Sequence, residues 1–414
     1  MGIPVKPRSV ADVLLLALPL VVLIVPQGTL ERTFVPELAF IGFLLLTVVA
    51  TLAQSCWQQP ALVIRRSQFQ PLLLVVLVFL LLLNPIWSLW QGNDPARVVM
   101  TILPFVMMGV YYLIALRCLS AHTLSTLVVM LALSGVVLGL VVLVNYFVGS
   151  QSGPMMRSTG IEGERSLTLP LLPMAGVLVT AWALGALQGR VARLWGVAAL
   201  VMVLAIIMTV TRAMLLAYLI GVAAAIFVMS RHGGAAMRKR IWQRLLVGML
   251  IVLVLAAPLV AQWVERLDPT SEGDVGTILG RLDEYTAFFE AFAASPLLGK
   301  GMGYLASYPS DFDFVLRDNG ITVCHSHLFF LAGTTGLLGM FLYYGLLVSG
   351  WFRLLGQANR AGQQPDRLMV IAGMAGAVLA GVLFTLTSTT FTALSYNLFL
   401  GVFLICASTE WGRE

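Results

Sequence analysis

The sequence contains few charged residues: aspartate, glutamate, lysine and arginine together make up 11% of its 414 residues. A typical water-soluble domain has about 25% charged residues. This chain instead has 59% hydrophobic residues and a mean hydropathy of +0.94. A soluble globular protein is therefore excluded, and we expect most side chains to face membrane lipids or neighbouring helices.

Cysteine is also scarce, with four residues in the whole chain. Cys56, Cys118, Cys324 and Cys406 lie far apart and form no CxxC pair or metal-ligand spacing. We expect neither a disulfide framework nor a cysteine metal site. Clear internal repeats are absent too, which disfavours the symmetric halves found in many transporters.

Long apolar stretches are what the sequence does contain. A bilayer core of roughly 30 Å needs about 20 apolar residues per helix, and about 12 such runs are present. They cover residues 10–27, 37–54, 71–89, 98–116, 124–147, 168–187, 193–210, 213–229, 245–263, 327–349, 368–387 and 390–408. The prediction is an all-α polytopic membrane protein, with the first run a transmembrane helix rather than a signal peptide.

The distribution of basic residues predicts the orientation of the chain. Lysine and arginine are preferred in cytoplasmic loops. With the N-terminus inside, most basic residues, including the cluster Arg238-Lys239-Arg240, lie on the cytoplasmic side and most acidic residues on the other. Both termini are therefore predicted to be cytoplasmic. The net charge of +6 follows from this topology and does not indicate nucleic-acid binding.

Two connections on the outer side are longer than the others. One runs from Gln151 to Ser166, and the other from about Glu265 to His325. A long connection in a compact protein usually has its own fold and task. We therefore divide the chain into helices with short loops at 1–262, an outer loop domain at 263–326, and three further helices with the C-terminus at 327–414.

The larger outer loop contains a sequence with helical periodicity. Apolar side chains recur at spacings of three and four at Ile278, Leu282, Tyr285, Phe289 and Phe292. We predict a helix that rests this stripe on the membrane surface or on the transmembrane bundle. The glycine-rich segment GKGMG follows it and is interpreted as a turn.

Among the arginines on the predicted outer side, four are candidate ligand contacts: Arg157, Arg165, Arg212 and Arg281. Charges close to the membrane are costly and often mark function. Guanidinium groups bind phosphate oxygens through paired hydrogen bonds, so these arginines indicate an anionic ligand such as a diphosphate. The alternatives are an interfacial anchor for Arg212 and ion pairs with neighbouring glutamates for the other three.

Two histidines, His325 and His327, lie where the large loop returns to the membrane, in VCHSHLFF. A neutral imidazole can take a proton from a hydroxyl near neutral pH. The alternatives are helix caps or interfacial polar groups. A metal site with Asp311 and Asp313 would lack a third fixed partner, so no metal is expected.

The order of these motifs resembles the O-antigen ligase and polymerase superfamily. RLDEYTAFFEAFAASPLLGKGMGY at 281–304 and HSHLFFLAGTTGLLG at 325–339 are similar to the family's arginine, helix, glycine turn and histidine. TVTRAMLLAYL and RSTGIEGERSLTLPLLP resemble its earlier arginine segments. The resemblance implies a GT-C-like glycosyltransferase in the bacterial inner membrane, with a periplasmic loop domain and active site and no cofactor.

The resemblance also implies roles for individual residues. It makes His325 the catalytic base and places Arg212 and Arg281 on the diphosphate of the donor, with Arg157 and Arg165 as further contacts. Ser326 follows His325 where the family commonly has asparagine. His327 therefore stays open as the alternative base.

The activity implied is that of an O-antigen ligase in lipopolysaccharide biosynthesis. It would transfer the O-antigen glycan from undecaprenyl diphosphate to a sugar hydroxyl of lipid A–core, without metal and with inversion. Within the same superfamily the alternative is an O-antigen polymerase or a protein-directed oligosaccharide ligase. In another class it is a transporter or flippase of lipid-linked glycans, which would place charges near the bilayer midplane.

Overall fold

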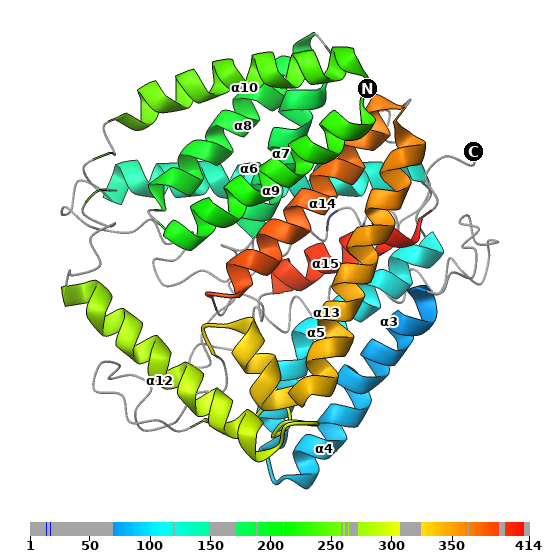
Figure 1. Ribbon diagram of the computed structural model, residues 1–414, viewed down its shortest axis with the longest axis vertical. Coiled ribbons are helices and arrows are strands. Elements are labelled where there is room, and N and C mark those ends of the chain that lie inside the picture. The colour runs from blue at the N-terminus through cyan, green and yellow to red at the C-terminus, as the bar shows by residue number, and fades with distance from the viewer. Residues whose placement is uncertain are drawn as a thin grey trace.

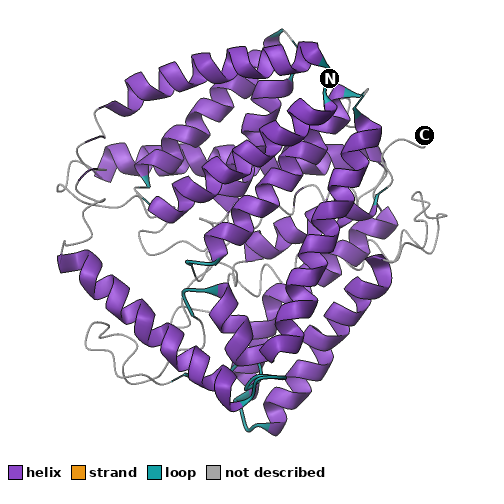
Figure 2. Ribbon diagram, in the orientation of Figure 1, coloured by secondary structure: helices purple, strands orange, loops and turns teal. Residues whose placement is uncertain are grey.

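The computed structural model describes residues 69–118, 121–149, 171–187, 189–209, 211–257, 272–306, 324–362, 364–388 and 394–409, with Leu14, Ala17, Val260 and Val264. Within these ranges every extended regular element is a helix, as Figure 2 shows by colour. The helices pack side by side in one bundle, with α12 crossing its lower left edge in Figure 1.

The helices are α3 (Phe69–Val78), the π-helix η1 (Phe79–Leu83), α4 (Asn84–Trp90), α5 (Pro95–Cys118), α6 (Ala121–Gly149), α7 (Leu171–Gly185), α8 (Arg190–Met208), α9 (Arg212–His232), α10 (Ala235–Ala256), α12 (Glu272–Ala294), α13 (His327–Ala361), α14 (Pro365–Thr385) and α15 (Leu394–Ser408). Each predicted apolar run from 71–89 onward coincides with these helices or overlaps them. The run 37–54 lies outside the described residues, and of the run 10–27 the structure describes Leu14 and Ala17.

Six helical segments of the described chain are long and apolar enough to cross a membrane. They are Pro71–Trp90, Leu124–Phe147, Arg190–Met208, Arg212–His232, His327–Ala361 and Pro365–Thr385. Shorter apolar helical stretches occupy Pro95–Gly109, Leu171–Gly185 and Tyr396–Ser408. The prediction of a polytopic helical membrane protein is confirmed.

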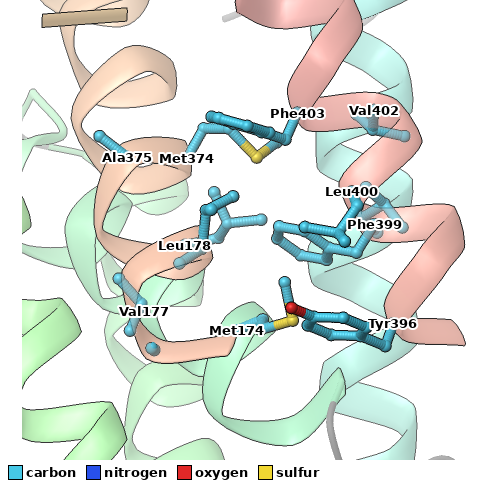
Figure 3. Packing of buried hydrophobic residues seen from close by; sticks show 14 of the residues in the cluster. Met174, Val177, Leu178, Met374, Ala375, Tyr396, Phe399, Leu400, Val402 and Phe403 are labelled. Atoms are coloured by element: carbon cyan, nitrogen blue, oxygen red, sulfur yellow. The ribbon is translucent and has the colours of Figure 1, made fainter. Parts of the chain in front are cut away.

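The centre of the bundle is formed by α7, α9, α14 and α15. Figure 3 shows Leu178 of α7 facing Phe399 of α15, and Met374 of α14 beside Phe403 of α15. The crossing of α9 and α14 is especially close, because a Cβ atom added to Gly376 would lie 2.3 Å from the carbonyl oxygen of Gly221. Small residues at such crossings bring two backbones together, which is how membrane helices gain packing contacts in lipid.

The helix α13 is divided at Gly336, whose φ of 63° and ψ of −166° are not helical. A short first part runs from His327 to Thr335, and a long second part runs from Leu337 to Ala361. A positive φ is readily adopted by glycine and strained in other residues. The long part crosses the bundle, while the short part, which begins at His327, lies at one end of the bundle.

Candidate active site

The glycine-rich loop after α12 holds the two parts of α13 together. The backbone N–H of Lys300 donates to the Gly333 carbonyl (2.8 Å), and that of Gly301 donates to the Thr334 carbonyl (2.9 Å). The last carbonyls of a helix have no partner within it, so the loop satisfies those that the break at Gly336 would leave open.

The segment at the start of this loop also caps the second part of α13. The N–H groups of Leu337 and Leu338 donate to the carbonyls of Pro296 (2.8 Å) and Leu297 (3.2 Å). Because the loop follows α12 directly, these bonds fix the end of α12 against the break in α13.

A buried asparagine at the start of α4 completes this junction. The side-chain amide of Asn84 donates to the Thr334 carbonyl (3.1 Å) and accepts from the N–H of Met302 (2.9 Å). Trp87 donates from its indole nitrogen to the Gly299 carbonyl (3.0 Å). Three elements that are distant in sequence thereby form one support.

His325 lies just before α13, beside this support, and contacts Glu284 of α12. Its Nδ1 lies 2.8 Å from Oε2 and 3.0 Å from Oε1 of the Glu284 carboxylate. The backbone N–H of His325 also donates to Oε2 (3.0 Å). An ionised carboxylate can only accept, so Nδ1 carries the hydrogen in the neutral ring and Nε2 keeps its lone pair.

The two members of this pair differ in their access to solvent. The Glu284 side chain is 6% exposed and the His325 side chain 20% exposed. The carboxylate is therefore enclosed behind the imidazole, which is the partner that a substrate can reach.

The face of α12 that packs against the rest of the protein carries Glu284, together with Ala287 and Phe288. Two members of the predicted apolar stripe point elsewhere, since Leu282 is 52% exposed and Phe289 is 55% exposed. The prediction that the stripe packs on the bundle is therefore wrong for Leu282 and Phe289. Contact with the membrane surface stays the prediction for these two residues. The inward face mixes a glutamate with small and aromatic residues, so apolar periodicity does not reveal it.

His327 has a different environment from His325. It is 1% exposed, and its ring packs edge-on against Tyr343 with ring centroids 4.8 Å apart and beside Tyr344 at 5.9 Å. A side chain enclosed in this way has no access for an acceptor hydroxyl. The geometry therefore favours His325 over His327 as the base.

Arg281 lies one helical turn before Glu284 on α12 and is partly buried. Residues three apart on a helix share a side, so its guanidinium belongs to the same region as the His325–Glu284 pair. The charge of Arg281 also acts on Tyr285, the residue after Glu284. Burial raises the pKa of the Tyr285 hydroxyl, the positive charge of Arg281 lowers it, and Cys324 and Glu284 each raise it. Within the described residues no ion pair joins Arg281 to Glu284, whose carboxylate contacts His325.

Arg212 is the first residue of α9 and is exposed. The connection from α13 to α14 is short, and α14 packs antiparallel to α9. The start of α9 therefore lies at the same end of the bundle as the break in α13 (Figure 1). Arg157 and Arg165 lie outside the described residues. The structure therefore places Arg281 one helical turn from Glu284, the partner of His325, and places Arg212 on a helix at the same end of the bundle.

Cys324 precedes His325 and is fully buried. Burial raises the pKa of its thiol to about 12; a backbone hydrogen bond from Ser326 opposes this shift, and the Glu284 charge adds to it. The thiol is therefore protonated at neutral pH, which argues against a cysteine nucleophile here.

In the described part of the chain, no three His, Cys, Asp or Glu side chains form a group that could hold a metal ion. Asp311 and Asp313 lie outside that part. A cavity of about 180 Å³ is lined by residues such as Trp182, Arg190 and Asp366. It lies where α7 ends and α14 begins, at the end of the bundle opposite His325, so we do not assign the chemistry to it.

These features define a helical, polytopic membrane protein with a histidine–glutamate pair at one end of its bundle. Residues 197–344 match the sequence profile of the family described as O-antigen ligase. The matched part includes Arg212, Arg281, Glu284 and His325. No curated protein matches the sequence.

Sequence reasoning names His325 but misses Glu284 as its partner. The two residues are 41 positions apart, and the sequence suggests the glutamate only as a partner of Arg281. Its position one turn after Arg281 indicates that the glutamate lies near a predicted site residue. Nothing in the sequence spacing indicates that it contacts His325.

Proposed function

We propose that the protein is an O-antigen ligase. It transfers the O-antigen glycan from undecaprenyl diphosphate to a sugar hydroxyl of lipid A–core, in lipopolysaccharide biosynthesis. The observation that carries the proposal is the accessible His325, hydrogen-bonded to Glu284, within the segment that matches the O-antigen ligase family.

In the proposed reaction the acceptor hydroxyl oxygen attacks the anomeric carbon of the donor sugar. The new C–O bond forms as the bond from that carbon to the phosphate oxygen breaks, and its electron pair leaves with undecaprenyl diphosphate. Nε2 of His325 takes the hydroxyl proton and later releases it to solvent or to the diphosphate. A single displacement of this kind inverts the anomeric centre and needs no metal.

Arginines supply the charge that the leaving group requires. Negative charge develops on the diphosphate as the bond breaks, and preorganised cations stabilise it in the transition state. We assign Arg281 and Arg212 to this clamp, with Arg157 and Arg165 as further contacts. Arg281 is best supported, because it shares one side of α12 with Glu284.

We place the site on the periplasmic face of the inner membrane, in a GT-C-like architecture. The support is the basic character of the opposite end, where α9 ends and α10 begins. There Arg240 and Arg244 donate to carbonyls at the end of α7, including Gly185 (3.1 Å) and Ala183 (2.8 Å). Basic residues at this end agree with a cytoplasmic location for it and for both termini.

The test is the lipopolysaccharide profile of a deletion strain complemented with wild type, His325→Ala or His327→Ala at matched protein levels. Wild type should restore the long-chain ladder on lipid A–core, and His325→Ala should not. His327→Ala should retain transfer per folded molecule, because His327 is enclosed. If the deletion leaves lipid A–core with a single O-unit, the protein is a polymerase.

A further inference from the structure

We propose that Glu284 is a positioning residue: it fixes the ring orientation and the tautomer of His325 and stabilises the imidazolium that forms in transfer. This inference rests on the proposed function and extends it to a residue outside the predicted site. It places the control of the base on α12, the same helix that carries Arg281.

The contacts of Glu284 hold both the ring and the backbone of His325. Oε2 accepts from the backbone N–H at 3.0 Å and lies 2.8 Å from Nδ1, while Oε1 lies 3.0 Å from Nδ1. A contact to Nδ1 alone would allow the ring and its backbone to move together. Holding both limits the directions in which Nε2 can point.

The tautomer follows from the same contacts. A carboxylate offers no hydrogen, so Nδ1 must carry one and Nε2 must be the free acceptor. When Nε2 takes the proton, the imidazolium lies 2.8 Å from a carboxylate that is nearly excluded from solvent. A charge pair in such surroundings is screened less than one in water, so it favours the protonated product of the step.

The position of Glu284 on α12 links the base to the diphosphate clamp. Arg281 precedes it by three residues, and the loop after α12 is bonded to both parts of α13. Helix α12 therefore keeps a fixed spacing between Arg281, which binds the leaving group, and Glu284, which orients the base.

Glu284→Gln separates positioning from simple bracing. The introduced amide has one oxygen for the backbone N–H, and its NH₂ group then faces Nδ1 of His325. That arrangement favours hydrogen on Nε2, where the ring can no longer accept a proton. We expect kcat to fall by about 10²- to 10⁴-fold, the range of general-base catalysis, with KM for the donor little changed.

The matched control is Glu290→Gln, an exposed position on the same helix, which should keep the wild-type kcat. A second readout is ¹⁵N NMR of protein labelled at histidine, of which the chain has four. At about pH 8, where an ordinary imidazole is neutral, the His325 signal should report hydrogen on Nδ1 in wild type and on Nε2 in Glu284→Gln. His325→Ala identifies that signal by its loss.

Wild-type kcat or an unchanged His325 tautomer in Glu284→Gln would overturn the inference. If kcat falls only in proportion to the loss of folded protein and the tautomer is unchanged, Glu284 has a purely structural role, which would also overturn the inference. If wild type shows no transfer at all, the proposed function fails, while the NMR comparison still decides whether Glu284 controls His325.

Discussion

At the scale of single residues, two histidines separated by one position have opposite environments. His325 reaches solvent and contacts a buried carboxylate, whereas His327 is enclosed by tyrosines. The sequence HSH offers both as bases, because spacing along the chain does not report burial. The distinction depends on the contact of His325 with Glu284 of α12 and on the packing of His327 against Tyr343 and Tyr344. Neither could be predicted from the motif.

The proposed arginine clamp gives a prediction at the scale of residues. Arg281→Lys and Arg212→Lys should each lower kcat/KM by about 10- to 100-fold, because an ammonium group cannot reproduce the paired hydrogen bonds of guanidinium. Purified enzyme and lipid-linked donor would give these values. Arg231→Lys is the matched control, an exposed arginine in the last turn of the same helix as Arg212. Wild-type kinetics in both variants would remove these residues from the clamp.

At the scale of elements, apolar run length predicts the helices well, since a membrane helix must be apolar along its length. It does not predict their breaks. In η1 the backbone N–H of Asn84 donates to the Phe79 carbonyl, five residues back, just before Pro85, which has no N–H. The division of α13 at Gly336 depends on partners in the loop after α12, and such long-range contacts leave no local pattern in the sequence.

The close crossing of α9 and α14 predicts the direction in which a glycine substitution changes the stability of the protein. Alanine normally stabilises a helix relative to glycine by up to about 1 kcal/mol. Gly376→Ala should instead destabilise the protein by about 1–3 kcal/mol, because its Cβ would meet the Gly221 carbonyl.

Gly196→Ala on α8 is the matched control, since a Cβ there meets nothing within 4 Å. Thermal unfolding in detergent should show a lower midpoint for Gly376→Ala and an equal or higher one for Gly196→Ala. Equal midpoints for both variants would mean that the two helices are able to separate without cost.

At the scale of the whole molecule, the position of the polar groups distinguishes an enzyme from a transporter. A transporter of lipid-linked glycans would place charged sites near the bilayer midplane. Here Arg212 is the first residue of one candidate span and His325 precedes another, while Glu284 and Arg281 lie on α12, which is not among the candidate spans of the described chain. This arrangement favours chemistry at one face of the membrane.

The last prediction follows from that arrangement and from the proposed mechanism, which needs neither a metal nor a sealed membrane. Purified protein in detergent, given undecaprenyl-diphosphate-linked glycan and lipid A–core, should form the ligated product, and EDTA should leave the rate unchanged. His325→Ala in the same detergent is the control for background transfer. A rate that falls with EDTA and returns with a divalent cation would contradict the metal-free mechanism. Failure to form product in detergent, combined with glycan movement across sealed vesicles, would favour the transporter instead.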